Sequence, residues 1–310
     1  MQTGTSIASP TFPIAWDPEE LRQRTTGWRG WVSPAISMGV LLAALIQLRA
    51  LDLGHLPAML PVRPAFWLAL VGAYLALPVS EWLIYRRLWS LPLSGFIPLL
   101  RKRISNEILL GYSGEVYFYA WMRRRRRLSA APFGVIKDVS VLSAQTGNLV
   151  TLAMLGLAWP ALGTLQLGQH GRALLLSAMV VAAMSLPAML LRRRLFTLAR
   201  PELWRISALH LARIAASLLL SALAWHEALP AVALSWWVLL AALRQLLSRL
   251  PLMPNKDIVF AGLIAYLIGA RGNLADVVAI TASLILLAHL VLGIALALAD
   301  LLTPPAGHAR

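Results

Sequence analysis

Residues 101–127 read RKRISNEILLGYSGEVYFYAWMRRRRR, and this stretch decides how the rest of the chain is organised. Two basic clusters, 101–103 and 123–127, enclose a mostly apolar segment that is too short to cross a bilayer, which takes about 20 residues. Gly111 and Gly114 interrupt the segment near its centre. The pattern favours either a segment that enters the membrane and returns, or an amphipathic cytoplasmic hairpin held on the lipid headgroups by its arginines.

The composition indicates an integral membrane protein. Hydrophobic residues make up 59% of the chain, charged residues only 13%, and the mean hydropathy is +0.70. Apolar segments this long and numerous exceed what a soluble core requires. The chain has no cysteine, which excludes disulfides, thiolate metal sites and a cysteine nucleophile, and its six histidines show no metal-ligand spacing. We therefore expect no metal and no cofactor.

The expected fold is an all-α polytopic membrane protein with about 7–8 transmembrane helices and one or two short re-entrant helical segments. Spans are predicted at about 30–49, 66–85, 139–163, 173–191, 202–224, 229–248 and 275–302, with a short apolar segment at 258–269. Residues 1–29 form a polar cytoplasmic N-terminal arm, residues 30–302 a single transmembrane domain that includes the basic loop 86–139, and residues 303–310 a tail.

The positive charge predicts the orientation. The net charge is +15, and most of the 28 Arg and Lys residues fall in loops that lie on one side of the predicted spans, such as 86–138, 192–205 and 244–256. The positive-inside rule then places the N-terminus on the cytoplasmic side of the membrane, which we expect to be a bacterial inner membrane. Attraction to anionic lipid explains the same charge, so membrane lipids are the expected partners and nucleic acid is not. The side of the C-terminus depends on whether 258–269 crosses.

Two short apolar segments stand at similar places in the two halves of the chain. Residues 104–122 and 258–269 are both brief, and each follows prolines and basic residues. Paired short, Gly- or Pro-interrupted segments are the best sequence indication of a transporter binding site. No residue-level repeat accompanies them, so the correspondence rests on hydropathy alone.

One arginine lies inside a predicted span. An intramembrane charge costs at least a few kcal/mol, so Arg213 should face a carboxylate, a water-filled cavity or an anionic ligand. Structural pairing with Glu81 or Asp276 and a phosphate-binding role both stay open. Glu107 and Glu115 would share a helical face only if no glycine broke the helix between them.

A family resemblance adds to this interpretation. The basic-aromatic residues 85–89 (YRRLW), then Asn106, the pair Gly114-Glu115 and later residues 250–256 (LPLMPNK) resemble the lysylphosphatidylglycerol synthase transmembrane region, a flippase-like integral membrane family. The resemblance is one of architecture and extends over most of the predicted spans. It implies binding or translocation of an anionic or polyprenyl-linked lipid.

Two groups of candidate residues follow. The substrate-binding candidates are Asn106, Glu107, Glu115, Lys137, Arg213 and Lys256. The candidates for attracting lipid headgroups are Arg101, Lys102, Arg103, Arg123, Arg124 and Arg125. The sequence predicts a lipid-translocating protein without an identifiable catalytic residue. A membrane-embedded transferase on a lipid-linked substrate and a structural subunit of a membrane assembly stay open as alternatives, as do a homo-oligomer and a membrane-complex partner.

Overall fold

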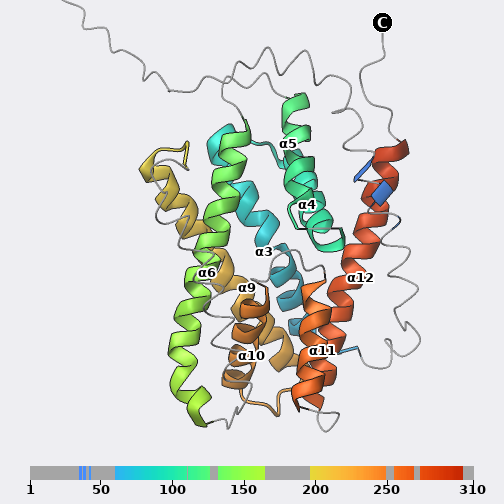
Figure 1. Ribbon diagram of the computed structural model, residues 1–310. Helices are drawn as coiled ribbons and strands as arrows, with labels where there is room; N and C mark the ends of the chain where they lie inside the picture. Colours follow the sequence, from blue (N-terminus) through green and yellow to red (C-terminus); the bar gives the residue numbers. More distant parts are fainter. Residues whose placement is uncertain are drawn as a thin grey trace, which may run out of the picture.

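The structure is a computed structural model of the whole chain, and every element in its described part is a helix (Figure 1). It describes residues 60–109, 111–125, 132–164, 196–248, 255–268 and 273–302, with five further residues between 35 and 42. Most of the predicted span 30–49, the whole span 173–191, the N-terminal arm and the tail lie outside the described residues. The all-α prediction is confirmed for the part that is described.

Among the residues that the structure describes, three helices are long and apolar enough to cross a membrane: α3 (Pro64–Trp89), α9 (Arg200–Ala228) and, within α12 (Asn273–Leu302), residues 273–299. The other elements are the short helix η2 (Leu93–Gly95), α4 (Phe96–Ile108), α5 (Ser113–Arg125), α6 (Pro132–Thr164), α10 (Leu234–Leu247) and α11 (Lys256–Ile268). The span expected at 229–248 is instead a 14-residue helix, α10. At about 1.5 Å per residue it is shorter than a bilayer core of about 30 Å.

Helices α3 and α9 pack side by side in opposite directions. Arg87, near the end of α3, pairs with Glu202 at the start of α9 at 3.2 Å. Arg63, immediately before α3, pairs with Glu227 near the end of α9 at 3.3 Å. The two ion pairs, at opposite ends of the helices, show that α3 and α9 are antiparallel.

Helices α4 and α5 form a hairpin that follows α3. After Trp89 the chain turns, and α4 runs back beside α3, because Lys102 contacts Glu81 and the later Arg103 contacts the still earlier Tyr74. The chain then reverses between the end of α4 and the start of α5. Tyr112 has a φ of 74°, a left-handed conformation that L-residues rarely adopt, so the reversal is a sharp one.

Helices α10 and α11 make the corresponding pair after α9. Arg244 of α10 reaches Ser221, seven residues before the end of α9, so α10 runs back beside α9. Arg244 also pairs with Asp257 in the first turn of α11. Asn255, directly before α11, has a φ of 50°. We call α4–α5 the first hairpin and α10–α11 the second hairpin.

The described helices fall into two halves of opposite direction. The units α3, first hairpin, α6 and α9, second hairpin, α12 have the same order of elements, and their first helices are antiparallel. In Figure 1 the first hairpin lies in the upper half of the bundle and the second in the lower half. Helices α6 and α12 lie on opposite sides of the bundle. This is the arrangement of an inverted-topology repeat.

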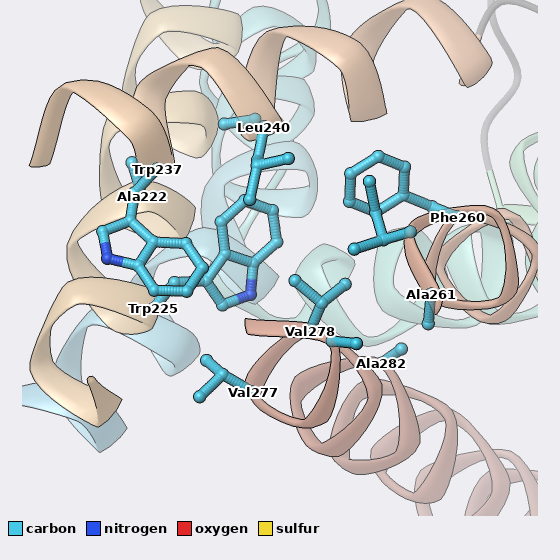
Figure 2. Close-up of a cluster of buried hydrophobic side chains, with 12 residues drawn as sticks. Ala222, Trp225, Trp237, Leu240, Phe260, Ala261, Val277, Val278 and Ala282 are labelled. Atoms are coloured by element: carbon cyan, nitrogen blue, oxygen red, sulfur yellow. The ribbon is translucent and has the colours of Figure 1, made fainter. Parts of the chain in front are cut away.

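Aromatic packing holds the second hairpin against α9 and α12 (Figure 2). Trp225 of α9 lies with its ring centroid 6.0 Å from that of Trp237 in α10 and 6.1 Å from that of Phe260 in α11. All three side chains are almost fully buried. Since α10 and α11 are short, burial of these large side chains stabilises them where helix propensity alone would not.

Candidate functional site

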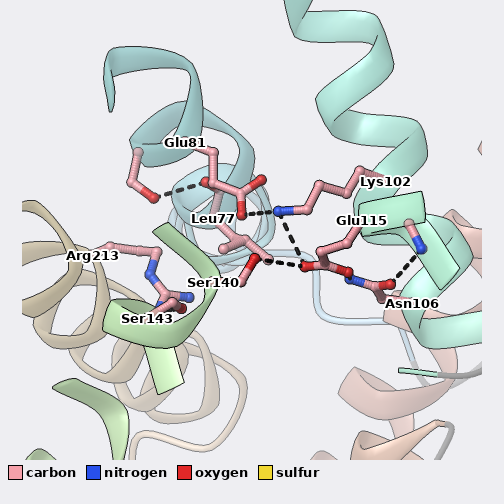
Figure 3. Close-up of polar contacts among 10 residues, drawn as sticks. Leu77, Glu81, Lys102, Asn106, Glu115, Ser140, Ser143 and Arg213 are labelled. Atoms are coloured by element: carbon pink, nitrogen blue, oxygen red, sulfur yellow. Dashed lines mark hydrogen bonds and ion pairs between the residues drawn. The ribbon is translucent and has the colours of Figure 1, made fainter. Parts of the chain in front are cut away.

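A buried ion-pair cluster joins the first hairpin to α3 (Figure 3). The ammonium of Lys102 lies 2.5 Å from a carboxylate oxygen of Glu81 and 3.3 Å from one of Glu115. The Lys102 side chain is only 3% exposed. Burial lowers the pKa of Lys102, but Glu115 and Glu81 raise it more, so its net direction is upward. A buried cation between two carboxylates therefore stays charged.

Asn106 and a serine of α6 fix the position of the Glu115 carboxylate. The Asn106 amide donates to Glu115 at 2.9 Å, and its own oxygen accepts from the backbone N–H of Gly114 at 2.7 Å. The hydroxyl of Ser140 lies 3.5 Å from the other Glu115 oxygen. Burial raises the pKa of Glu115, whereas Lys102 and the bond from Asn106 lower it, and the net pKa lies below the usual value. Glu115 is thus held as a carboxylate.

Gly114 lets the two helices of the first hairpin approach. A Cβ at this position would meet the backbone carbonyl of Lys102 and lie 2.9 Å from the side-chain oxygen of Asn106. Without a side chain, the first turn of α5 rests directly on α4. Gly114 and Glu115 therefore act together, because the close approach of the helices at Gly114 brings the Glu115 carboxylate to Lys102.

Arg213 of α9 extends this polar region across the bundle. Its guanidinium donates to the hydroxyl of Ser143 in α6 at 3.2 Å (Figure 3). His210, one turn earlier, is fully buried and lies within electrostatic reach of both Arg213 and Lys102. Glu81, one of the two acids considered for Arg213 from the sequence, pairs with Lys102.

Pro78 explains a contact in the middle of α3. A proline has no N–H, so the carbonyl of Tyr74, four residues earlier, loses its helical hydrogen bond. An apolar environment requires a substitute donor. The guanidinium of Arg103 supplies it, and Arg103 also lies 4.3 Å above the centre of the Tyr74 ring.

A second charged cluster lies where the two hairpins meet. Arg244 pairs with Asp257 at 2.5 Å, and the backbone N–H of Asn255 donates to the carbonyl of Glu107 at 3.3 Å. The ammonium of Lys256 donates to the carbonyl of Ser248 at 2.7 Å. The residues 244–256, expected from their charge to form a cytoplasmic loop, thus include side chains enclosed between helices.

The two clusters correspond residue by residue. Glu115 follows Lys102 by thirteen residues, and Asp257 follows Arg244 by thirteen. In each hairpin the base lies in the first helix, the acid in the first turn of the second, and a left-handed residue directly before that helix. Each base also contacts the preceding long helix, at Glu81 or at Ser221. The structure therefore shows a residue-level match between the halves that the sequence pattern did not reveal.

The remaining predicted residues take other positions. Lys137 pairs with Asp138 at 3.3 Å, and Asp138 accepts from the backbone N–H groups of Thr197 and Leu198, so Lys137 belongs to a different contact. Arg101 is buried over the ring of Tyr117.

The headgroup-attracting candidates also divide. Arg123 lies beside Tyr119 in the last part of α5. The side chains of Arg124 and Arg125 lie outside the described residues. Lys102 and Arg103, expected from the sequence to attract headgroups, instead make the buried contacts described above.

Sequence reasoning missed three members of the clusters as site residues: Glu81, Arg244 and Asp257. Glu81 and Arg244 each lie within an apolar helix, and an ionisable residue in such a helix is by default a functional candidate. That signal was present for both. The equal spacing of thirteen residues between base and acid was also present in the sequence. It did not indicate contact, because residues thirteen apart come close only if the chain reverses between them.

A groove of about 530 Å³ lies between described residues of α6 and α9, close to Arg213. Apolar side chains such as Leu142, Leu149 and Leu211 line most of the groove, and the polar side chains of Gln145 and Ser207 also line it. Its mostly apolar lining suits an acyl chain better than a polar solute.

Comparisons of the chain with protein-family models, curated proteins and solved structures give no match. The class of protein therefore rests on the structure. The described helices, three of them long and apolar enough to cross a membrane, hold one buried and one partly buried ion pair between them and support a helical membrane protein.

Proposed function

We propose that this protein is an integral membrane transporter that binds an anionic or lipid-linked substrate and moves it between leaflets. One observation carries the proposal: two hairpins enter the bundle from opposite ends, and each holds a base–acid pair that is at least partly buried near its tip. In known transporters, substrate sites form near the bilayer midplane between inverted repeats. We take α4–α5 and α10–α11 as re-entrant hairpins, because helices of 13 or 14 residues are too short to cross the bilayer core and their charged side chains contact the long helices α3 and α9.

The two clusters lie at different depths. Glu81 is eight residues before the end of α3, about 12 Å along the axis, and Ser221 is seven residues before the end of the antiparallel α9, about 10 Å. The clusters therefore face opposite ends of the bundle. Arg213 and Arg103 lie between them in depth. Together these groups support a polar path for a charged headgroup through otherwise apolar helices.

Charge and shape favour a lipid as the substrate. A phosphate would interact with the guanidinium of Arg213, while an acyl chain would occupy the groove between α6 and α9. Basic residues at the end of α5, such as Arg123, would attract anionic headgroups at about 1 kcal/mol per charge near the surface. In this proposal the N-terminus and the tip of α5 lie on the cytoplasmic side of a bacterial inner membrane.

The test is leaflet exchange of fluorescent phospholipids in proteoliposomes, with anionic, zwitterionic and polyprenyl lipids compared. We expect exchange faster than in empty vesicles for at least one lipid class, and its loss in Arg213→Ala and Glu115→Gln. Arg205→Ala is the matched control, because Arg205 lies on the same helix but is exposed. Exchange at the rate of empty vesicles for every lipid would contradict the proposal, provided that the reconstituted protein is folded.

A further inference from the structure

Glu107 is the acidic residue at the meeting point of the two hairpins. It lies in the last turn of α4, and its backbone carbonyl accepts the N–H of Asn255 from the second hairpin. Its carboxylate forms no hydrogen bond or ion pair with the residues that the structure describes. Every other acid of the two clusters has a partner. Glu107 is therefore the one carboxylate of these clusters that is not committed to holding the hairpins in place.

Charged groups from three helices face Glu107. They are Arg103 on α4, Arg244 on α10, and Lys256 and Asp257 on α11. Each of the three cations already serves another acceptor: the Tyr74 carbonyl, Asp257 and the Ser248 carbonyl, respectively. The charge of Glu107 is thus balanced through space and not by a direct bond.

Two ring side chains complete the surroundings from α3 and α12. The rings of Tyr74 and His289 lie 5.1 Å apart, centroid to centroid, and His289 is within electrostatic reach of both Arg103 and Asp257. The hydroxyl of Tyr74 and Nε2 of His289 are buried and have no hydrogen-bond partner among the described residues. Buried polar atoms without a partner are rare and indicate a site that is completed by something else, such as water.

A small cavity lies beside the Arg244–Asp257 pair. Its volume is about 10 Å³, about the least that one water molecule requires, and Ser221, Arg244, Asp257 and Thr281 line it on its polar side. A water there would connect the Arg244–Asp257 pair to the hydroxyls of Ser221 and Thr281.

Burial raises the pKa of Glu107, and the charge of Asp257 raises it further. The charges of Arg103, Lys256 and Arg244 lower this pKa by less, so its net direction is upward.

We propose that Glu107 is a proton-binding site, and that its carboxylate takes up a proton from water on one side of the membrane and releases it on the other as the two hairpins rearrange. The ligand is the proton alone, and only an O–H bond forms and breaks. A neutral Glu107 removes one negative charge from between the hairpins, which changes the attraction between their tips. The coupling part of this inference rests on the proposed transport function, whereas the proton site itself does not.

Infrared difference spectroscopy of the purified protein in lipid nanodiscs tests the proton site directly. The wild type should show the carbonyl stretch of a protonated carboxylic acid that titrates above the range of an exposed glutamate. Glu107→Gln should lose this band, and Glu107→Asp should retain a titrating band. Glu227→Gln, a partly exposed acid at the far end of α9, should leave the band unchanged. A spectrum that is the same in the wild type and in Glu107→Gln would overturn the proton site.

A transport measurement tests the coupling. In proteoliposomes with a pH difference across the membrane, the wild type should exchange lipid faster than without it, and Glu107→Gln should exchange lipid at one rate under both conditions. Retention of the full acceleration in Glu107→Gln would overturn the coupling. If no variant exchanges lipid but the infrared band is present and lost in Glu107→Gln, the transport function fails while the proton site stands.

Discussion

The backbone N–H of Asn255 donates to the carbonyl oxygen of Glu107 at 3.3 Å, and this bond joins the tips of two hairpins that are 148 residues apart in sequence. The bond requires no particular side chain at either position. It depends on Asn255 adopting a φ of 50°, which turns its N–H toward α4. The two halves of the protein thus meet through backbone at a place where the surrounding side chains are charged.

Loss of Lys102 should destabilise the protein strongly. Lys102→Met leaves Glu81 and Glu115 without their shared cation, and removing one partner of a buried ion pair costs about 3–5 kcal/mol. Arg63→Ala, which breaks an exposed pair with Glu227, should change stability little. Unfolding by denaturant in detergent micelles measures both. Equal small effects would show that the cluster is hydrated and not buried.

Gly114→Ala should open the first hairpin. The added methyl group would meet the Lys102 carbonyl and the Asn106 side chain, and such overpacking costs about 1–3 kcal/mol. Gly111→Ala is the matched control, because a Cβ at Gly111 meets nothing within 4 Å. The thermal unfolding midpoint should fall for Gly114→Ala and stay near the wild type for Gly111→Ala. The reverse order would contradict the close approach of α4 and α5.

Cysteine cross-linking should detect contact between the hairpins. The chain has no cysteine, so Ile108→Cys with Ile258→Cys gives a pair without background. Ile258 packs against the buried cluster that contains Ile108, and we expect a short bifunctional thiol reagent to join the two. The pair Ile97→Cys with Ile258→Cys should not react, since Ile97 lies eleven residues, about 16 Å, earlier on α4. After the chain is cleaved between the two cysteines, gel mobility shows whether the two fragments remain cross-linked.

Acid should weaken the first hairpin through Glu115. The folded pKa of Glu115 lies below its unfolded value of about 4.3, so its contribution to stability is complete above that pH and is lost as the pH falls toward the folded pKa. Glu115→Gln cannot titrate, and its stability should depend less on pH in this acid range. Unfolding midpoints between neutral pH and about pH 3 would show the difference. Parallel curves for the two proteins would contradict the role of Lys102 as its charge partner.

Hydropathy alone predicted the all-helical class and located the long apolar helices near 66–85, 202–224 and 275–302. Each of these three predictions corresponds to a helix long enough to cross a membrane, because about 20 apolar residues in a row leave few other stable structures. The same reasoning failed for 229–248, where 14 residues form the helix and the others make its flanks. Hydropathy measures how favourably a segment transfers into an apolar phase. A buried hairpin and a membrane span can therefore have the same hydropathy.

The site was predictable in part. Asn106 and Glu115 were singled out from the sequence, and the structure joins them directly by a hydrogen bond. Their role in binding a substrate stays a prediction. Lys102 was predicted for a different role, because a lysine in a basic cluster gives no sign that two carboxylates from other helices will enclose it.

The sequence by itself determined that this chain forms apolar helices, that its basic clusters flank short interrupted segments, and that a few charges must lie where water is scarce. Those properties follow from local composition, since each helix satisfies its own backbone hydrogen bonds. Only the tertiary structure decided which charges meet. Lys102 finds Glu81 and Glu115, and Arg244 finds Asp257, because two chain reversals and the antiparallel packing of α3 with α9 bring distant residues into contact, and a buried charge is stable only beside its partner.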